Sequence, residues 1–222
     1  MSRDIRAIWQ IKKQSEFFSL IVVSVAIVGG LILNFIFGKM GMDEDYIGDV
    51  ILGAMSFAYI LMNFFIKVML VAEEVPRGIS FGMTRKKLFI YSRAIEFAEL
   101  LILAIIAISC SSVLTINTTG KIIMIIFGML MISEGLVGNS LLRYGKIVYW
   151  IYYILFMIVI IGGPRLAESI PAVYDAGAVV IDVIITPFYN QFFVWGGVLL
   201  FTCVCVFINW LTFRRVPVAY NV

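Results

Sequence analysis

Long runs of apolar residues alternate with short polar or charged segments along the whole chain. A transmembrane helix needs about 20 apolar residues. Runs of roughly this length are Phe18–Phe37, Val50–Val71, Phe97–Ile116, Ile122–Val137, Ile147–Ile161 and Phe192–Phe213. The fourth and fifth are short or interrupted, so the pattern predicts six spans and leaves five as the alternative. We expect an all-α integral membrane protein.

Composition supports this class. The chain is 62% hydrophobic and 14% charged, whereas an ordinary soluble domain carries about 25% charged residues, and its mean hydropathy is +1.04. We expect a single transmembrane domain over residues 1–222. Its parts are expected at 1–17 (interfacial helix), 18–71 (spans one and two), 72–96 (cytoplasmic loop), 97–161 (spans three to five), 162–191 (outer segment), 192–213 (span six) and 214–222 (cytoplasmic tail).

Basic residues are unevenly distributed between the two sides that six spans would create. With the N-terminus inside, all 17 lysines and arginines except Lys39, Lys121 and Arg165 fall in cytoplasmic segments. Positive residues favour the cytoplasmic side, so both termini are expected on the inside of the membrane. The net charge of +3 reflects this topology and gives no reason to expect nucleic acid as a partner.

The first 17 residues have an amphipathic pattern. Ile5, Ile8 and Trp9 share one helical face, with basic residues elsewhere. A helix of this kind lies at the membrane interface, and we expect one here, leading into the first span. A basic, poorly ordered tail is the competing interpretation.

The segment 72–96 is the most substantial charged stretch between two apolar runs. Pro76 and Gly78 are expected to break the preceding helix, Gly82 supplies a second break, and Thr84 stands where a helix N-cap would. The pattern predicts a bent loop followed by a short helix at the membrane surface.

Three apolar residues of this segment, Ile79, Phe81 and Met83, are expected to project into water, where exposed apolar groups usually have a partner. Arg85, Lys86 and Lys87 follow directly. The alternative is a basic turn that only fixes topology.

Acidic residues inside apolar spans are candidates for function because burying a carboxylate in hydrocarbon is costly. Glu96, Glu99 and Glu134 are such residues. Arg93 precedes Glu96 by three positions and is expected to pair with it on one helix face. Salt-bridged anchors and a proton relay both remain open, with Glu99 the deepest acid of the third span.

The segment 162–191 contains an apolar piece, Ala176–Ile185, between Pro171 and Pro187. This piece is too short to cross a bilayer, and runs of 10–14 residues are often re-entrant or interfacial. A re-entrant helix pair and a packed extracellular loop are both consistent with it.

Several classes of chemistry lack their residues. The chain has no histidine, which excludes sites that need imidazole as ligand or base. Its three cysteines lie in apolar runs and suggest neither a disulfide framework nor a metal site. No phosphate-binding loop is present, since Gly138–Ile147 has the wrong spacing. We expect no enzyme activity, metal or cofactor on this chain.

Taken together, the amphipathic start, six spans, charged loop after span two and candidate re-entrant segment resemble the permease subunit of an ABC-2 type exporter. The most specific part is Phe81-Gly82-Met83-Thr84-Arg85-Lys86. The compact length is similar to small bacterial permeases that expel amphipathic peptides, including those of the phenol-soluble modulin type.

The resemblance implies a function and partners. A second permease copy or paralogue would complete a translocation path in the bilayer, and a separate ABC ATPase subunit would supply Mg-ATP hydrolysis. A coupling helix at about Val75–Lys87 would contact that ATPase, with the loop Asn139–Lys146 as a minor second contact. Amphipathic or antimicrobial peptides would be the cargo.

Two other classes stay open. One is a membrane sensor or accessory subunit whose charged loop binds a partner other than an ATPase. The other is a proton-coupled secondary transporter that uses Glu99 and Glu134 as proton carriers.

Overall fold

The structure is a computed structural model that describes residues 3–39, 47–111 and 114–216. Within those ranges every element is a helix and no strand occurs. The chain divides into two compact units. Unit 1 holds the described residues up to Thr119 and unit 2 those from Gly120 onward, and each is described by itself. The expected all-α class is confirmed.

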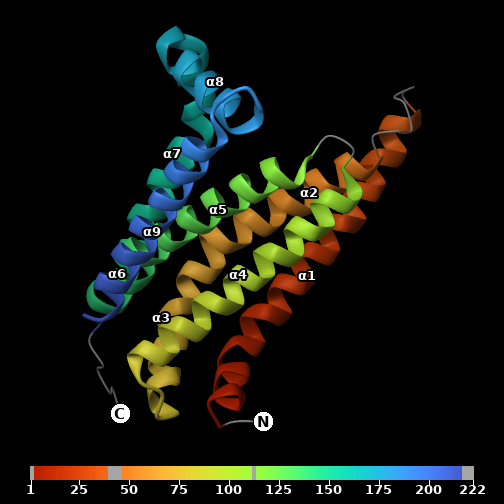
Figure 1. Cartoon of the computed structure of the whole chain (residues 1–222). Helices are drawn as coiled ribbons and strands as arrows, with labels where there is room; N and C mark the ends of the chain where they lie inside the picture. The colour runs from red at the N-terminus through yellow and green to blue at the C-terminus, as the bar shows by residue number, and fades with distance from the viewer. Residues whose placement is uncertain (1–2, 40–46, 112–113, 217–222) are drawn as a thin grey trace. The chain divides into compact units, whose positions relative to one another are not determined.

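Unit 1 contains three long helical rods, which run side by side in Figure 1. The first is α1 (Arg3–Lys39) and the third is α4 (Arg85–Cys110). The second joins three elements end to end, α2 (Ile47–Met62), the π-helix η2 (Asn63–Lys67) and α3 (Val68–Ser80). A Cβ on Gly30 would lie 3.1 Å from the Ile51 Cα, so this glycine allows α1 and α2 to approach closely.

The N-terminal residues are helical, because α1 is continuous from Arg3 into the first apolar run. Ala7, Ile8 and Ile11 are buried, while Trp9 is 60% exposed. Part of the apolar face of this segment therefore packs against protein, and its placement at the membrane interface stays a prediction.

The connection between α3 and α4 also differs from the expectation. Pro76 lies inside α3, which continues to Ser80, so the predicted break at Pro76 and Gly78 is wrong. Gly82 has a φ of +76°, a conformation that favours glycine. The Thr84 hydroxyl accepts a bond from the Lys87 amide at 3.4 Å, which confirms the N-cap. The segment is thus a helical hairpin, and α4 takes the place of a short surface helix.

Unit 2 is built from the helical residues from Gly120 onward, and its first helix begins a few residues earlier, in unit 1. They are α5 (Ile116–Ser133), the π-helix η3 (Glu134–Gly138), α6 (Asn139–Tyr144), α7 (Lys146–Ser169), α8 (Pro171–Ile185) and α9 (Gln191–Phe213). The expected loop Asn139–Lys146 is helical as far as Tyr144, and the chain turns only at Gly145, whose φ is +77°. The helix of the fifth apolar run extends beyond Ile161, since α7 continues through Pro164 to Ser169.

The α5–η3 rod packs closely on α9 at glycine positions. A Cβ on Gly128 would lie 2.7 Å from the Phe201 ring, and one on Gly135 would lie 2.9 Å from the Asn209 Cα. The Thr202 hydroxyl also donates to the Met124 carbonyl at 3.0 Å. Small residues of this kind are typical of helix contacts in membranes.

Five helical stretches in the described residues are long and apolar enough to cross a membrane. They are Arg6–Ile36, Gly48–Ser80, Ile116–Tyr144, Lys146–Ser169 and Gln191–Phe213. The 26-residue α4 is not among them and carries the charged residues Arg93, Glu96 and Glu99. These lengths and compositions are those of a membrane protein, whereas the sixth span stays a prediction.

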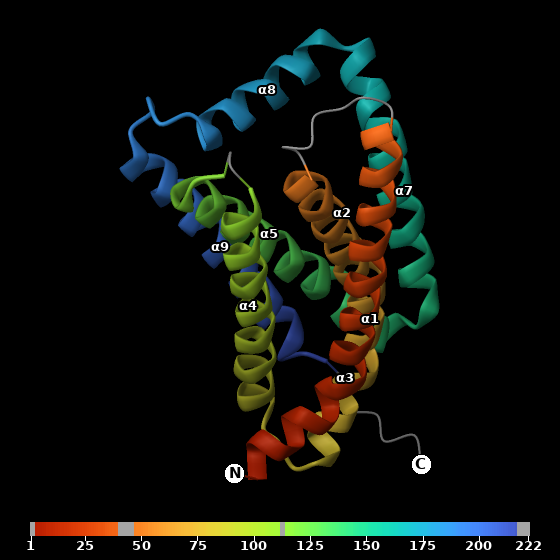
Figure 2. The same ribbon diagram turned by 90° about the vertical axis from the view of Figure 1, so that its right-hand side faces the viewer.

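Helix α8 lies between the end of α7 and the start of α9 (Figure 2). It has 15 residues, none of them buried. That length confirms that the segment is too short to span as a helix. Its re-entrant placement stays a prediction.

Candidate functional site

The turn between α3 and α4, together with the residues flanking it, forms an exposed surface that we call the hairpin tip (Arg77–Lys87). Phe81 is 45% exposed at its apex. Arg77, Lys86 and Lys87 are exposed around it, and Arg85 is half-buried. The tip therefore presents one aromatic ring among basic side chains.

The tip is held rigidly on the body of unit 1. Met83 is only 5% exposed, which contradicts the expectation that it projects outward, and Ile79 is half-buried. A Cβ on Gly78 would lie 2.6 Å from the Leu88 side chain, so the glycine lets α3 and α4 meet just behind the turn. The Lys87 ammonium pairs with Asp4 at 2.7 Å, which ties the tip to the start of α1.

Behind the tip, buried and half-buried charges from all three rods form two groups of ion pairs, which together we call the charge cluster. It consists of Lys12, Glu16, Lys67, Glu74, Arg93, Glu96 and Glu99. Three of these residues are cationic and four are acidic. Because each rod contributes members, the cluster connects α1, the α2–η2–α3 rod and α4.

Lys12 of α1 joins two acids in the first part of the charge cluster. Its ammonium lies 2.8 Å from a Glu74 carboxylate oxygen and 3.0 Å from one of Glu96. Arg93 pairs with the other Glu96 oxygen at 2.8 Å. The side chains of Lys12 and Glu96 are each 3% exposed, so these ion pairs are shielded from water.

Lys67 organises the second part of the charge cluster. Its ammonium donates to Glu99 and lies 3.6 Å from Glu16. The Tyr59 hydroxyl donates to the same Glu99 carboxylate at 2.9 Å. Lys67 is the last residue of η2, and the Asn63 amide in that π-helix donates to the Tyr59 carbonyl at 2.7 Å. Local π-helix geometry, which often marks functional sites, thus places Lys67 beside two acids.

The energetic consequence follows from burial. Removing one partner of a buried ion pair leaves an uncompensated charge and typically costs about 3–5 kcal/mol. The three rods therefore cannot separate at this level without exposing or stranding charges. The charge cluster acts as a stiff link between the hairpin tip and the rest of unit 1.

Sequence reasoning found part of this network. The predicted Arg93–Glu96 pair is confirmed. The partners of Glu99 were missed, as were those of Lys12, because they come from other helices. The available signal was Lys67 itself, a lysine inside the apolar run Val50–Val71.

Glu134, the third predicted acid, lies in unit 2 at the start of η3 and is 3% exposed. Arg143 of α6 and Lys146 of α7, the next cations along the chain, are exposed. The Arg143 guanidinium lies 5.2 Å from the centroid of the Tyr144 ring.

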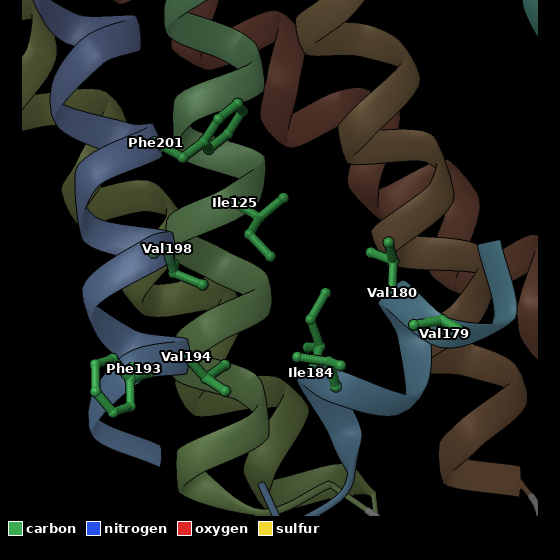
Figure 3. Close-up of a pocket in the computed structure, with 10 residues that line it drawn as sticks. Ile125, Val179, Val180, Ile184, Phe193, Val194, Val198 and Phe201 are labelled. Carbon is green, nitrogen blue, oxygen red and sulfur yellow. The ribbon is translucent and has the colours of Figure 1, made fainter. Parts of the chain in front are cut away.

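Unit 2 contains a cavity of about 560 Å³ lined by apolar residues between α5, α8 and α9. Figure 3 shows Ile184 of α8, Ile125 of α5 and Phe201 of α9 around it. Lys121 is fully buried, and its ammonium donates to the Ile184 carbonyl at 3.0 Å. A cation near a helix C-terminus is favourable, so Lys121 holds the end of α8 beside this cavity.

Metal chemistry finds no support in the described ranges, where no group of three or more Cys, Asp or Glu side chains is placed to hold an ion. The comparisons with known proteins identify no relative, since no family model, curated protein or solved structure matches the chain. A function must therefore be argued from the hairpin tip, the charge cluster and the membrane-length helices.

Proposed function

We propose that this protein is the membrane subunit of an ATP-driven ABC exporter and that its hairpin tip docks a separate ATPase subunit. The observation that carries the proposal is the exposed Phe81 on a basic tip connected through ion pairs to three long helical rods, two of which are long and apolar enough to cross a membrane. Such a tip offers a partner both an anchor and a rigid connection to the bilayer.

The surface chemistry of the tip fits a protein contact. Aromatic anchors and arginines are enriched in the energetically dominant parts of interfaces. Phe81 supplies the apolar anchor, and Arg77, Lys86 and Lys87 add positive charge around it. An acidic surface on the ATPase or lipid phosphates would complement these charges.

Buried ion pairs give the mechanism its transmission step. If the ATPase displaces the tip on binding ATP, α3 and α4 move first. Glu74 of α3 and Glu96 of α4 both hold Lys12 of α1, so α1 is carried with them. The shift is then a rigid-body movement of unit 1. Two such subunits in a bacterial plasma membrane, with termini inside, would open a path for amphipathic peptides.

The experiment is co-purification of the chain with candidate ATPase subunits encoded beside it, comparing the wild type with Phe81→Asp. Phe188→Asp is a matched control, because Phe188 is 95% exposed in unit 2. We expect the wild type and Phe188→Asp to retain an ATP-hydrolysing partner and Phe81→Asp to lose it. Recovery of no ATPase, or equal recovery with all three proteins, contradicts the proposal.

The remaining classes predict different results. An accessory subunit would retain a partner that does not hydrolyse ATP. A proton-coupled transporter would lose activity when the proton gradient is collapsed with ATP still present. The pairing of Glu99 with Lys67 and Tyr59 favours a structural role for this acid over repeated proton exchange.

A further inference from the structure

A second cavity, of about 300 Å³, lies in unit 1 between α1, α2 and α4. Glu16 and Glu99 line one part of it, beside Tyr59. The remaining lining is almost wholly apolar and consists of Ser19, Leu20, Val23, Met55, Ile102, Leu103 and Ile106. The cavity is therefore amphipathic, with carboxylates in one part and hydrocarbon in the rest.

The charge balance beside this cavity is incomplete. With every group ionised, the charge cluster has one more carboxylate than cations. Uncompensated charge in an apolar interior is costly. Glu16 and Glu99, with side chains 25% and 17% exposed, are more accessible than Glu74 and Glu96. The excess charge thus borders the cavity.

The hydrogen bonds of Glu99 also favour a cationic guest beside this residue. Glu99 receives bonds from Lys67 and Tyr59 on Oε2, whereas its Oε1 atom receives none from a cation or a hydroxyl. The neighbouring carboxyl is that of Glu16, and the two acids can share a proton whose place a cationic guest would take. Buried carboxylate oxygens normally have at least one partner. A guest that carries a positive charge would compensate both this atom and the excess charge.

The apolar part defines the rest of the guest. Leu20 and Ile102 are 65% and 58% exposed, so the cavity opens at the side of the rods. Entry from that side would pass through hydrocarbon, where an alkyl chain partitions well. We propose that this cavity binds an amphiphilic organic monocation, an alkylammonium whose head lies against Glu16 and Glu99 and whose chain packs on Leu103 and Ile106.

That such a molecule is also cargo rests on the proposed export function, whereas its binding in the cavity does not depend on that function. The test therefore needs no ATPase. The full chain in phosphatidylcholine nanodiscs is titrated with radiolabelled tetradecylammonium, whose head can donate hydrogen bonds, and empty nanodiscs give the partitioning background. Failure of this binding would leave ATPase docking untouched, and loss of docking would leave the binding result standing.

Two variants examine the two parts of the cavity. Glu99→Gln removes charge, and Ile106→Trp fills the apolar part while leaving the charge cluster in place. Glu73→Gln is the matched control, because Glu73 is 58% exposed on α3 and pairs with Arg77. We expect binding above background that weakens at least tenfold in both variants and is unchanged in Glu73→Gln.

Guest chemistry sharpens the test. Tetradecanol should compete at least tenfold less well than the ammonium, and tetradecyl sulfate should not compete. Binding no greater than in empty nanodiscs, equal competition by tetradecanol, or unchanged binding in both Glu99→Gln and Ile106→Trp would overturn the inference.

Discussion

The two units solve the same packing problem with different chemistry. Each contains a long rod interrupted by a π-helix, η2 in unit 1 and η3 in unit 2. In unit 1 the rod meets its neighbours through the buried ion pairs of Lys12 and Lys67. In unit 2 the corresponding contact is made by Gly128 and Gly135 against α9.

The difference teaches how each unit responds to displacement. Ion pairs that link three helices resist separation, since breaking any one of them would leave a buried charge without its partner. Glycine contacts bring helices close and depend on shape, while the Asn139 amide adds bonds of 3.2 Å to the Asn209 side chain and 2.8 Å to Thr212. Unit 1 is suited to transmit force from the hairpin tip, and unit 2 to hold helices in close contact.

The largest expected effect comes from removing the cation that joins the three rods. Lys12→Met leaves Glu74 and Glu96 without their shared partner, and we expect unfolding to become easier by about 3–5 kcal/mol. Unfolding of the detergent-solubilised chain, followed by tryptophan fluorescence during an SDS titration, measures this change.

The adjacent Lys13 provides the control, because it is exposed. Lys13→Met should change stability by less than about 0.5 kcal/mol. Equal effects at the two neighbouring lysines would show that the charge cluster does not hold unit 1 together.

A shape change in unit 2 should have a smaller effect. Gly135→Ala places a methyl group 2.9 Å from the Asn209 Cα, and overpacking of this kind typically costs about 1–3 kcal/mol. The same SDS titration applies. Gly196→Ala in α9 is the control, since a Cβ there meets nothing within 4 Å. A loss at position 196 as large as that at 135 would contradict the close-contact account of unit 2.

An exposed ion pair should matter least to stability. Arg77 and Glu73 pair at 3.0 Å on the surface of α3, with side chains 49% and 58% exposed. Such pairs contribute about 0.3–0.5 kcal/mol. Arg77→Gln should therefore leave the SDS midpoint nearly unchanged while weakening capture of the ATPase. A large loss of stability without a change in capture would be the opposite result.

A local pH effect is expected at the end of α8. The Thr186 and Tyr189 hydroxyls donate to Asp182, and these bonds hold the pKa of its carboxyl below the usual 3.8. Because the folded-state pKa is lowered, the stability that these bonds add is present above about pH 3.8. It is lost as the pH falls through the folded-state pKa. Hydrogen exchange at this turn should accelerate at low pH, and Asp182→Asn should abolish that dependence. Exchange that shows the same pH response in the variant would disprove the assignment.

Local features were predictable from the sequence. The last apolar run, Phe192–Phe213, matches α9 within one residue, because Asn190 caps the helix by accepting from the Phe192 amide. The Arg93–Glu96 pair was also predictable, since its members are three residues apart on one helix. Both depend on short-range geometry.

Features that depend on other helices were not predictable. Lys12 and Glu96 are 84 positions apart, and their contact requires the packing of α1 against α4. Pro76 and Pro164 suggest breaks by local rules, yet both lie inside helices. Met83 is apolar on a charged segment, and only the close approach of α3 and α4 at Gly78 shows why it turns inward.

The central claim is that an ATPase docks at the hairpin tip, and site-specific photo-crosslinking tests it most directly. A benzoylphenylalanine replaces Phe81 in one version of the chain and Phe188 in the other, and both are irradiated in cells. The account predicts a covalent adduct with an ATP-hydrolysing subunit from position 81 and none from position 188. An adduct from position 81 that contains only lipid or a protein without ATPase activity would contradict it.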